Sequence, residues 1–131
     1  TRDVLKLPHH WSYTSLGPEK GDRITEPTAP VARFFEHFAQ QGAIIVSTSL
    51  PIPTDDSSDQ PPHRQAANYY RETVLPPVDG TFVVTMEHPT VQRPAPLVVR
   101  IDELRATIVR DRLVGAAAIL SRPAPRAGSD A

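Results

Sequence analysis

The hydrophobic and polar positions of this chain predict one well-defined amphipathic helix and a second, shorter one. Pro30 suits the first position of a helix, and Gly42 is placed to end it. We therefore predict the main helix over residues 30–41. Its apolar face recurs at i, i+3, i+4 and i+7 and is formed by Val31, Phe34, Phe35 and Phe38. Residues 65–74 show a shorter form of the same periodicity and predict a short helix.

Alternation of apolar and polar residues predicts strands on either side of the short helix. Residues 43–50 (AIIVSTSL) are rich in β-branched side chains, and Pro51 and Pro53 end this strand. Residues 81–88 (TFVVTMEH) alternate in the same way, and residues 97–101 (LVVRI) predict a third strand.

The pattern after residue 101 fits two interpretations. Asp102 is suited to cap a helix, and on this basis we favour a helix over residues 103–112 followed by a strand over residues 113–121. The apolar residues of this region are not confined to one helical face, so a strand fits about as well. The alternating positions that favour a strand are Leu104, Ala106 and Ile108.

These elements predict an α+β fold: a small sheet of three to four strands with helix 30–41 packed on it. The chain has 15 prolines in 131 residues, about twice the usual share of ~5%. Because proline fixes φ and removes a backbone donor, it interrupts regular structure. We predict an extended N-terminal arm over residues 1–29, a single domain over residues 30–121 with a polar loop at 51–64, and a C-terminal tail over residues 122–131.

Composition limits the kinds of partner that the chain can bind. The net charge is −1, which gives no general attraction to nucleic acid or to anionic membranes. The charge is divided unevenly, however, with a net −4 over residues 1–89 and a net +3 over residues 90–131. There is no cysteine and no apolar run long enough to span a membrane, and we recognise no signal peptide. The chain begins at Thr1, from which we expect a processed or shortened N-terminus.

Five residues are weak candidates for a metal site. Imidazole and carboxylate groups bind Zn²⁺ or Mn²⁺ when a secondary-structure element presents them at a suitable spacing. His9 and His10 are adjacent, so in extended chain they point apart, and Asp55, Asp56 and His63 lie in the polar loop without a metal-binding motif. We therefore predict neither a metal nor another cofactor.

No arrangement of catalytic residues is apparent. Ser47, Thr48 and Ser49 are possible nucleophiles, but the G-x-S-x-G motif and glycine-rich phosphate loops are absent from the sequence. We predict that the chain is not an enzyme, and we infer no small-molecule substrate.

Arginines and aromatic residues are the candidates for partner binding. All seven basic residues after position 89 are arginines, which suit bidentate contacts with carboxylates or phosphates. This last third contains no aromatic side chain on which a base of RNA could stack. Trp11 and Tyr13 are the expected anchors of the N-terminal arm. The predicted partner-binding residues are Trp11, Tyr13, Arg105, Arg110, Arg112 and Arg122.

The proline-rich arms and the thin core favour a non-catalytic structural subunit of a large multi-protein assembly. Such a subunit recovers the entropy lost on ordering its arms through contacts with neighbouring subunits. A capsid-like shell, or an accessory subunit of an organellar or ribonucleoprotein complex, fits this description. An RNA-contacting subunit that uses the C-terminal arginines and a small metal-dependent enzyme are the alternatives.

Overall fold

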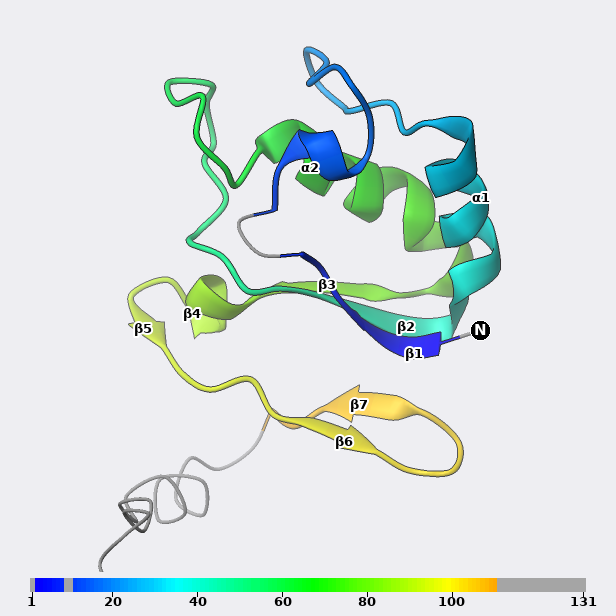
Figure 1. The fold of residues 1–131 in the computed structure, drawn as a ribbon. Coiled ribbons are helices and arrows are strands. Elements are labelled where there is room, and N and C mark those ends of the chain that lie inside the picture. Colours follow the sequence, from blue (N-terminus) through cyan, green and yellow to red (C-terminus); the bar gives the residue numbers. More distant parts are fainter. Residues whose placement is uncertain (1, 9–10, 111–131) are drawn as a thin grey trace, which may run out of the picture.

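The centre of the fold is a three-stranded parallel sheet with helices on one face and a β-hairpin on the other (Figure 1). The computed structural model describes residues 2–8 and 11–110. The sheet has the order β1-β2-β3, with the strands β1 (Arg2–Lys6), β2 (Ala39–Ser47) and β3 (Thr81–Val84). The fold therefore belongs to the mixed class of helices and strands.

Helices connect the parallel strands because neighbouring parallel strands require a crossover. The helix α1 (Ala29–Phe38) leads directly into β2. The helix α2 (Arg64–Tyr69) continues into a π-helical turn, η2 (Tyr70–Val74), and a short 3₁₀ turn, η3 (Pro76–Val78), precedes β3. Both helical segments cover the same face of the sheet (Figure 1).

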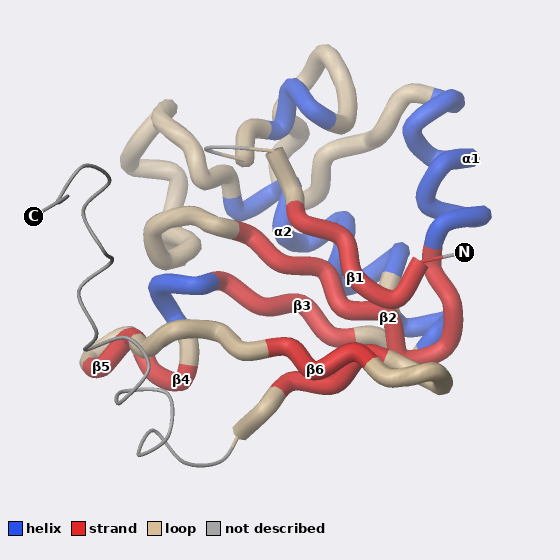
Figure 2. The backbone as a smooth tube through the Cα atoms, turned by 60° about the horizontal axis from the view of Figure 1, so that its bottom comes forward, coloured by secondary structure: helices blue, strands red, loops and turns tan. Residues whose placement is uncertain are grey.

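The other face of the sheet is covered by an antiparallel hairpin of β6 (Val99–Ile101) and β7 (Ala106–Ile108). This hairpin lies against the sheet on the side away from the helices (Figures 1 and 2). The remaining short elements are η1 (Tyr13–Ser15), η4 (Thr85–Glu87), β4 (Pro89–Thr90) and β5 (Arg93–Pro94).

The alternation of β2 divides the core into two layers. Ala43 and Ile45 pack with the helices, whereas Ile44 and Val46 pack against the hairpin. Successive side chains of a strand point to opposite faces, so one buried strand serves both layers. The helical layer also contains most of the buried aromatic side chains, whereas Ala106 is the buried hairpin residue of the second layer.

The helix predicted over residues 30–41 is confirmed, but it ends at Phe38 rather than near Gly42. The chain enters β2 at Ala39 without a loop, and Gly42 lies within that strand at φ 76°. The pairing of β1 with β2 shifts register in this region. Gly42 therefore permits an irregularity in a strand instead of ending a helix.

The sheet differs from the predicted one in three respects. The segment predicted as an extended arm over residues 1–29 contributes the edge strand β1, which pairs with β2. The strand predicted over residues 81–88 ends at Val84, where a 3₁₀ turn begins. The strand predicted over residues 97–101 lies in the separate hairpin and not in the main sheet.

The prediction of a helix over residues 103–112 is wrong for the described part of that segment. Leu104 lies in an exposed turn, and residues 106–108 form β7, so the alternating interpretation was the better one. The strand predicted over residues 113–121 and the tail over residues 122–131 lie outside the described residues. Within the described part of the chain, no helix has the length and apolar character needed to cross a bilayer.

Candidate protein-binding groove

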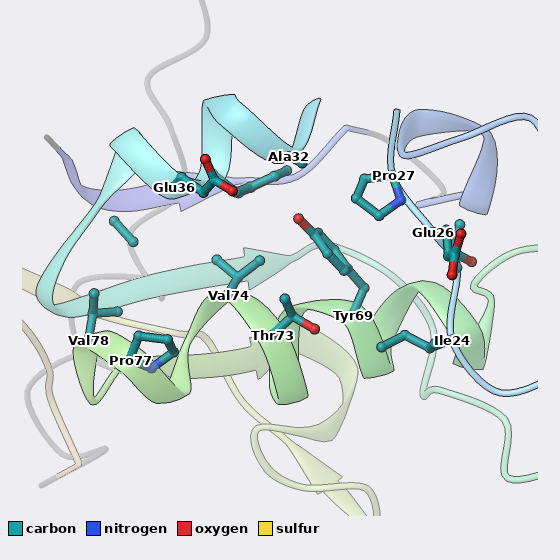
Figure 3. A pocket seen from close by; sticks show the side chains of 13 residues that line it. Ile24, Glu26, Pro27, Ala32, Glu36, Tyr69, Thr73, Val74, Pro77 and Val78 are labelled. Atoms are coloured by element: carbon teal, nitrogen blue, oxygen red, sulfur yellow. The ribbon is translucent and has the colours of Figure 1, made fainter. Parts of the chain in front are cut away.

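A groove of about 630 Å³ lies in the helical layer, between α1 on one side and α2 with η2 on the other (Figure 3). The segment 24–27 closes one end, and residues of η3 close the other. This volume is in the range of sites that hold ligands. The groove is lined by Ile24, Thr25, Glu26, Pro27, Ala32, Phe35, Glu36, Ala39, Tyr69, Thr73, Val74, Pro77 and Val78.

Buried apolar side chains form the floor of the groove. Phe35 of α1 and Tyr69 of α2 are packed edge to face, with ring centroids 6.0 Å apart and an interplanar angle of 75°. Phe35 makes a similar contact with Tyr70, at 5.2 Å, and Val74 is buried beside them. Edge-to-face packing of this kind fixes the orientation of the rings. The floor is therefore a preformed surface and does not depend on an occupant.

The segment 24–27 is held against α2 by hydrogen bonds. The Thr25 N–H donates to the carbonyl oxygen of Gln65 at 3.1 Å, and the Thr25 hydroxyl donates to the carbonyl of Lys20 at 2.6 Å. The Asn68 side chain donates to the carbonyl of Arg23 at 2.7 Å. Thr25 is fully buried, so its two hydrogen bonds are shielded from water, whereas the bond from Asn68 is exposed. This end of the groove is consequently fixed to the helix that forms its wall.

A glycine allows the segment 24–27 to pack closely on the preceding chain. A Cβ atom at Gly17 would overlap the carbonyl oxygen of Glu26. Thr28 N–H also donates to the carbonyl of Leu16 at 2.9 Å, next to this contact. Any larger residue at position 17 would therefore displace the backbone that forms one end of the groove.

Carboxylates surround the apolar floor. Glu26 and Glu36 line the groove and are exposed. A second hollow of about 510 Å³ shares Glu26 with the groove and adds Glu19 and Asp22. Among the described residues, none of these four carboxylates forms an ion pair. Two basic residues adjacent to them in sequence are paired with other carboxylates: Lys20 with Asp59 at 3.5 Å and Arg23 with Glu72 at 2.5 Å.

The negative charge of Glu36 acts on Tyr69 in the floor of the groove. Burial raises the pKa of the Tyr69 phenol, and the neighbouring negative charge of Glu36 raises it further. Tyr69 is therefore protonated at neutral pH and presents a hydroxyl beside a carboxylate (Figure 3). An aromatic ring next to a negative charge favours a bound cation. The groove thus combines an apolar floor with a negative rim.

The candidate metal ligands stabilise the polar loop. Asp56 accepts hydrogen bonds from Arg64 at 2.6 Å and from Gln65 at 2.8 Å, and Asp55 accepts one from the hydroxyl of Ser57 at 2.6 Å. His63 is buried, and its Nδ1 accepts the N–H of Tyr13 at 3.3 Å. His9 and His10 lie outside the described residues. Within residues 2–8 and 11–110, no three His, Asp or Glu side chains are grouped so that they could hold a metal ion.

The serines considered as nucleophiles lie at the carboxyl end of β2. Ser47 is buried, and its hydroxyl is 2.9 Å from that of Ser49. The Ser49 hydroxyl in turn donates to the carbonyl of Leu50. Neither hydroxyl has a histidine or carboxylate hydrogen-bond partner among the described residues.

The predicted anchors of the N-terminal arm pack on the chain's own core. Trp11 is 1% exposed and lies 5.0 Å from the ring of Phe82 and 5.6 Å from that of Tyr70. Tyr13 packs against the imidazole of His63. A contact between Trp11 and another protein would require this segment to leave the core.

The predicted arginine surface lies only partly within the described residues. Arg105 follows the tip of the β6–β7 hairpin, Arg110 follows β7, and both are exposed. Neither forms an ion pair with a described residue. Arg112 and Arg122 lie outside the described residues.

Sequence reasoning did not identify the groove. Its residues come from three separate segments, 24–27, 32–39 and 69–78, which only the folded chain brings together. The one signal available was the pair of adjacent tyrosines in the short helix, of which Tyr69 lines the groove. Comparisons with protein-family models, with curated proteins and with solved structures returned no match for this chain.

Proposed function

We propose that this chain is a non-catalytic assembly subunit, and that its groove binds an apolar segment of another protein that carries a positive charge. The observation that supports this proposal most strongly is the preformed floor of Phe35 and Tyr69 beside the carboxylates of Glu26 and Glu36. Apolar contacts supply most of the binding free energy in such a site, and charge complementarity supplies specificity.

The apolar part of the proposal follows from the shape and rigidity of the groove. A segment with one or two aliphatic side chains would cover Phe35 and Val74 without any rearrangement of the helices. A preformed site avoids the entropy loss of ordering the receptor, which strengthens binding. Lysine or arginine in the same segment would then lie beside Glu36 and over the ring of Tyr69.

Short synthetic peptides in which leucine and arginine alternate provide the test. We expect a fluorescently labelled peptide of this kind to bind the full chain, with fluorescence anisotropy as the readout. NMR shift changes should be concentrated on residues 24–27, 32–39 and 69–78. A peptide in which serine replaces leucine should bind at least about ten-fold more weakly, because it cannot cover the floor.

The charge requirement is tested by Glu36→Gln. We expect this variant to bind the leucine–arginine peptide about two- to five-fold more weakly, the effect of one partly exposed ion pair. Asp55→Asn removes an exposed carboxylate outside both the groove and the hairpin and serves as the matched control. Equal affinity for leucine–arginine and serine–arginine peptides, or shift changes located away from the groove, would contradict the proposal.

A further inference from the structure

We infer that the segment bound by the groove is the tip of the β6–β7 hairpin of a second copy of this chain, so that copies associate head to tail. This inference rests on the proposed function, because it names the segment that the groove receives. It is supported by the exposed apolar side chains at the tip, by their flanking charges, and by the position of the hairpin relative to the groove.

The tip of the hairpin presents two large apolar side chains to solvent. Leu104 is 89% exposed and Ile101 is 68% exposed, the highest values for large apolar residues in the described part of the chain. Leu104 lies in the turn, a position that polar residues and glycine usually occupy. Its side chain therefore contributes little to the stability of this fold and is free to contact another molecule.

The turn that carries Leu104 is held in place by local hydrogen bonds. The carboxylate of Asp102 accepts the N–H of Leu104 at 2.9 Å and that of Arg105 at 3.1 Å. Asp102 N–H also donates to the carbonyl of Arg105 at 3.1 Å. The tip is consequently pre-organised, so binding would cost little backbone conformational entropy.

The charge of the hairpin complements that of the groove. Arg100 and Arg105 flank the apolar tip, are exposed, and form no ion pair with a described residue. The carboxylate of Asp102 is engaged with the turn backbone, which leaves Glu103 as the opposing charge. The groove offers Glu26 and Glu36, which are likewise without ion-pair partners among the described residues. A segment in which arginines flank leucine and isoleucine therefore matches the apolar floor and the carboxylates of the groove.

The hairpin and the groove of one copy cannot meet. The groove lies in the helical layer, whereas the hairpin packs on the opposite face of the sheet (Figure 1). The contact must therefore join two copies, and it uses a different surface on each. Such an interface leaves one groove and one hairpin unoccupied at the ends, so association continues until a ring closes or a filament forms.

Sedimentation velocity over a range of concentrations tests this inference on the full chain. We expect the average mass to rise with concentration and the association to weaken with added salt. Leu104→Asp removes the apolar tip, and Glu36→Lys reverses a charge of the groove. Each should raise the dissociation constant at least about ten-fold. Val91→Asp changes a 52% exposed valine between β4 and β5 and should leave association unchanged. Circular dichroism establishes that each variant is folded.

An equimolar mixture of the two defective variants gives the most specific result. The intact hairpin of Glu36→Lys should bind the intact groove of Leu104→Asp and produce a 1:1 dimer that does not grow, although each variant alone is monomeric. Three results would overturn the inference. The wild-type chain could stay monomeric, it could form a symmetric dimer that neither substitution weakens, or the mixture of variants could stay monomeric. The leucine–arginine peptide is then tested on Leu104→Asp. If the wild-type chain does not self-associate but Leu104→Asp binds the peptide, the inference about the hairpin fails and the proposed function stands. If Leu104→Asp does not bind the peptide either, both fail.

Discussion

At the scale of single residues, Asp56 and His63 show how polar side chains order a loop that has little apolar surface. The carboxylate of Asp56 is engaged by Arg64 and Gln65, and His63 is buried against Tyr13. Buried or paired polar groups of this kind fix a loop that contains little apolar surface. The polar loop is therefore ordered by hydrogen bonds that its own residues and α2 supply.

Asp56 should make the stability of the fold sensitive to acid. The hydrogen bond from Arg64, followed by that from Gln65, holds the pKa of Asp56 below its ordinary value of 3.8. A carboxyl group whose pKa is depressed by folding stabilises the protein above its ordinary pKa, and this contribution is lost as the pH falls through the folded value. We therefore expect the free energy of unfolding to decline below about pH 5.

Urea denaturation at a series of pH values measures this effect. The decline should be smaller in Asp56→Asn, which cannot gain the proton, than in the control Glu103→Gln. NMR titration gives the pKa directly, and it should rise toward 3.8 in Arg64→Leu. An Asp56 pKa that is normal in the wild type, or that does not respond to the loss of Arg64, would show that this hydrogen bond is absent in solution.

At the scale of elements, hydrophobic periodicity was sufficient where local contacts determine the structure. The helix near residues 30–41, the short helix at 65–74, the second half of β2 and the beginning of β3 were predicted from their apolar spacing, but β2 begins at Ala39, before the strand predicted over residues 43–50. The strand β1 was not predicted. Its sequence, RDVLK, has only two apolar residues, and its pairing with β2 is a contact across more than thirty residues. Propensity alone does not reveal non-local pairing.

The hairpin was misassigned for a related reason. Leu104 was counted as a member of an apolar pattern, but it lies in a turn where it covers no part of the core. Ala106 and Ile108 follow the strand alternation and face the sheet. The helix was favoured because Asp102 suits an N-cap, but its carboxylate accepts the N–H groups of Leu104 and Arg105 in the turn of the hairpin. The same residue is central to the self-association that we infer.

The end of the groove formed by residues 24–27 depends on the absence of a side chain at Gly17. We expect Gly17→Ala to displace this segment and to lower the free energy of unfolding by about 1–3 kcal/mol, because a Cβ would overlap the carbonyl of Glu26. Affinity for the leucine–arginine peptide should fall as well. Peptide anisotropy and urea denaturation provide the two measurements.

Gly42→Ala is the matched control for this substitution. No atom lies near the position of its Cβ, although its φ of 76° makes alanine unfavourable there by about 1 kcal/mol. The control should therefore lose stability but keep its affinity for the peptide. Unchanged peptide affinity in Gly17→Ala would mean that residues 24–27 do not contribute to the binding site.

At the scale of the whole molecule, the N-terminal segment and the distribution of charge are the main features. The described part of residues 1–29 is built into the sheet and the helical core, with Trp11 at its centre. The core therefore includes a segment that the proline content had suggested would extend away from it. The negative charge of residues 1–89 includes the groove, and the positive charge of residues 90–131 includes the hairpin.

Assembly through a groove and a hairpin replaces assembly through an N-terminal arm as the favoured mode of association. Both surfaces are exposed in the folded chain, so neither requires the core to open. The groove could not be predicted from the sequence because its lining residues come from segments 24–39 and 69–78, which lie 30 positions apart in the chain. The exposed leucine of the hairpin gave no separate signal until its place in a turn was known.

The most direct test of the central claim is a reversal of charge preference in the groove. The double variant Glu26→Lys/Glu36→Lys should lose affinity for the leucine–arginine peptide and gain affinity for a leucine–glutamate peptide, as measured by fluorescence anisotropy at low salt. The wild-type chain should show the opposite preference, and both preferences should weaken as salt is added. If both proteins bind the two peptides equally well, or if neither protein binds either peptide, the groove is not the binding site proposed for this subunit.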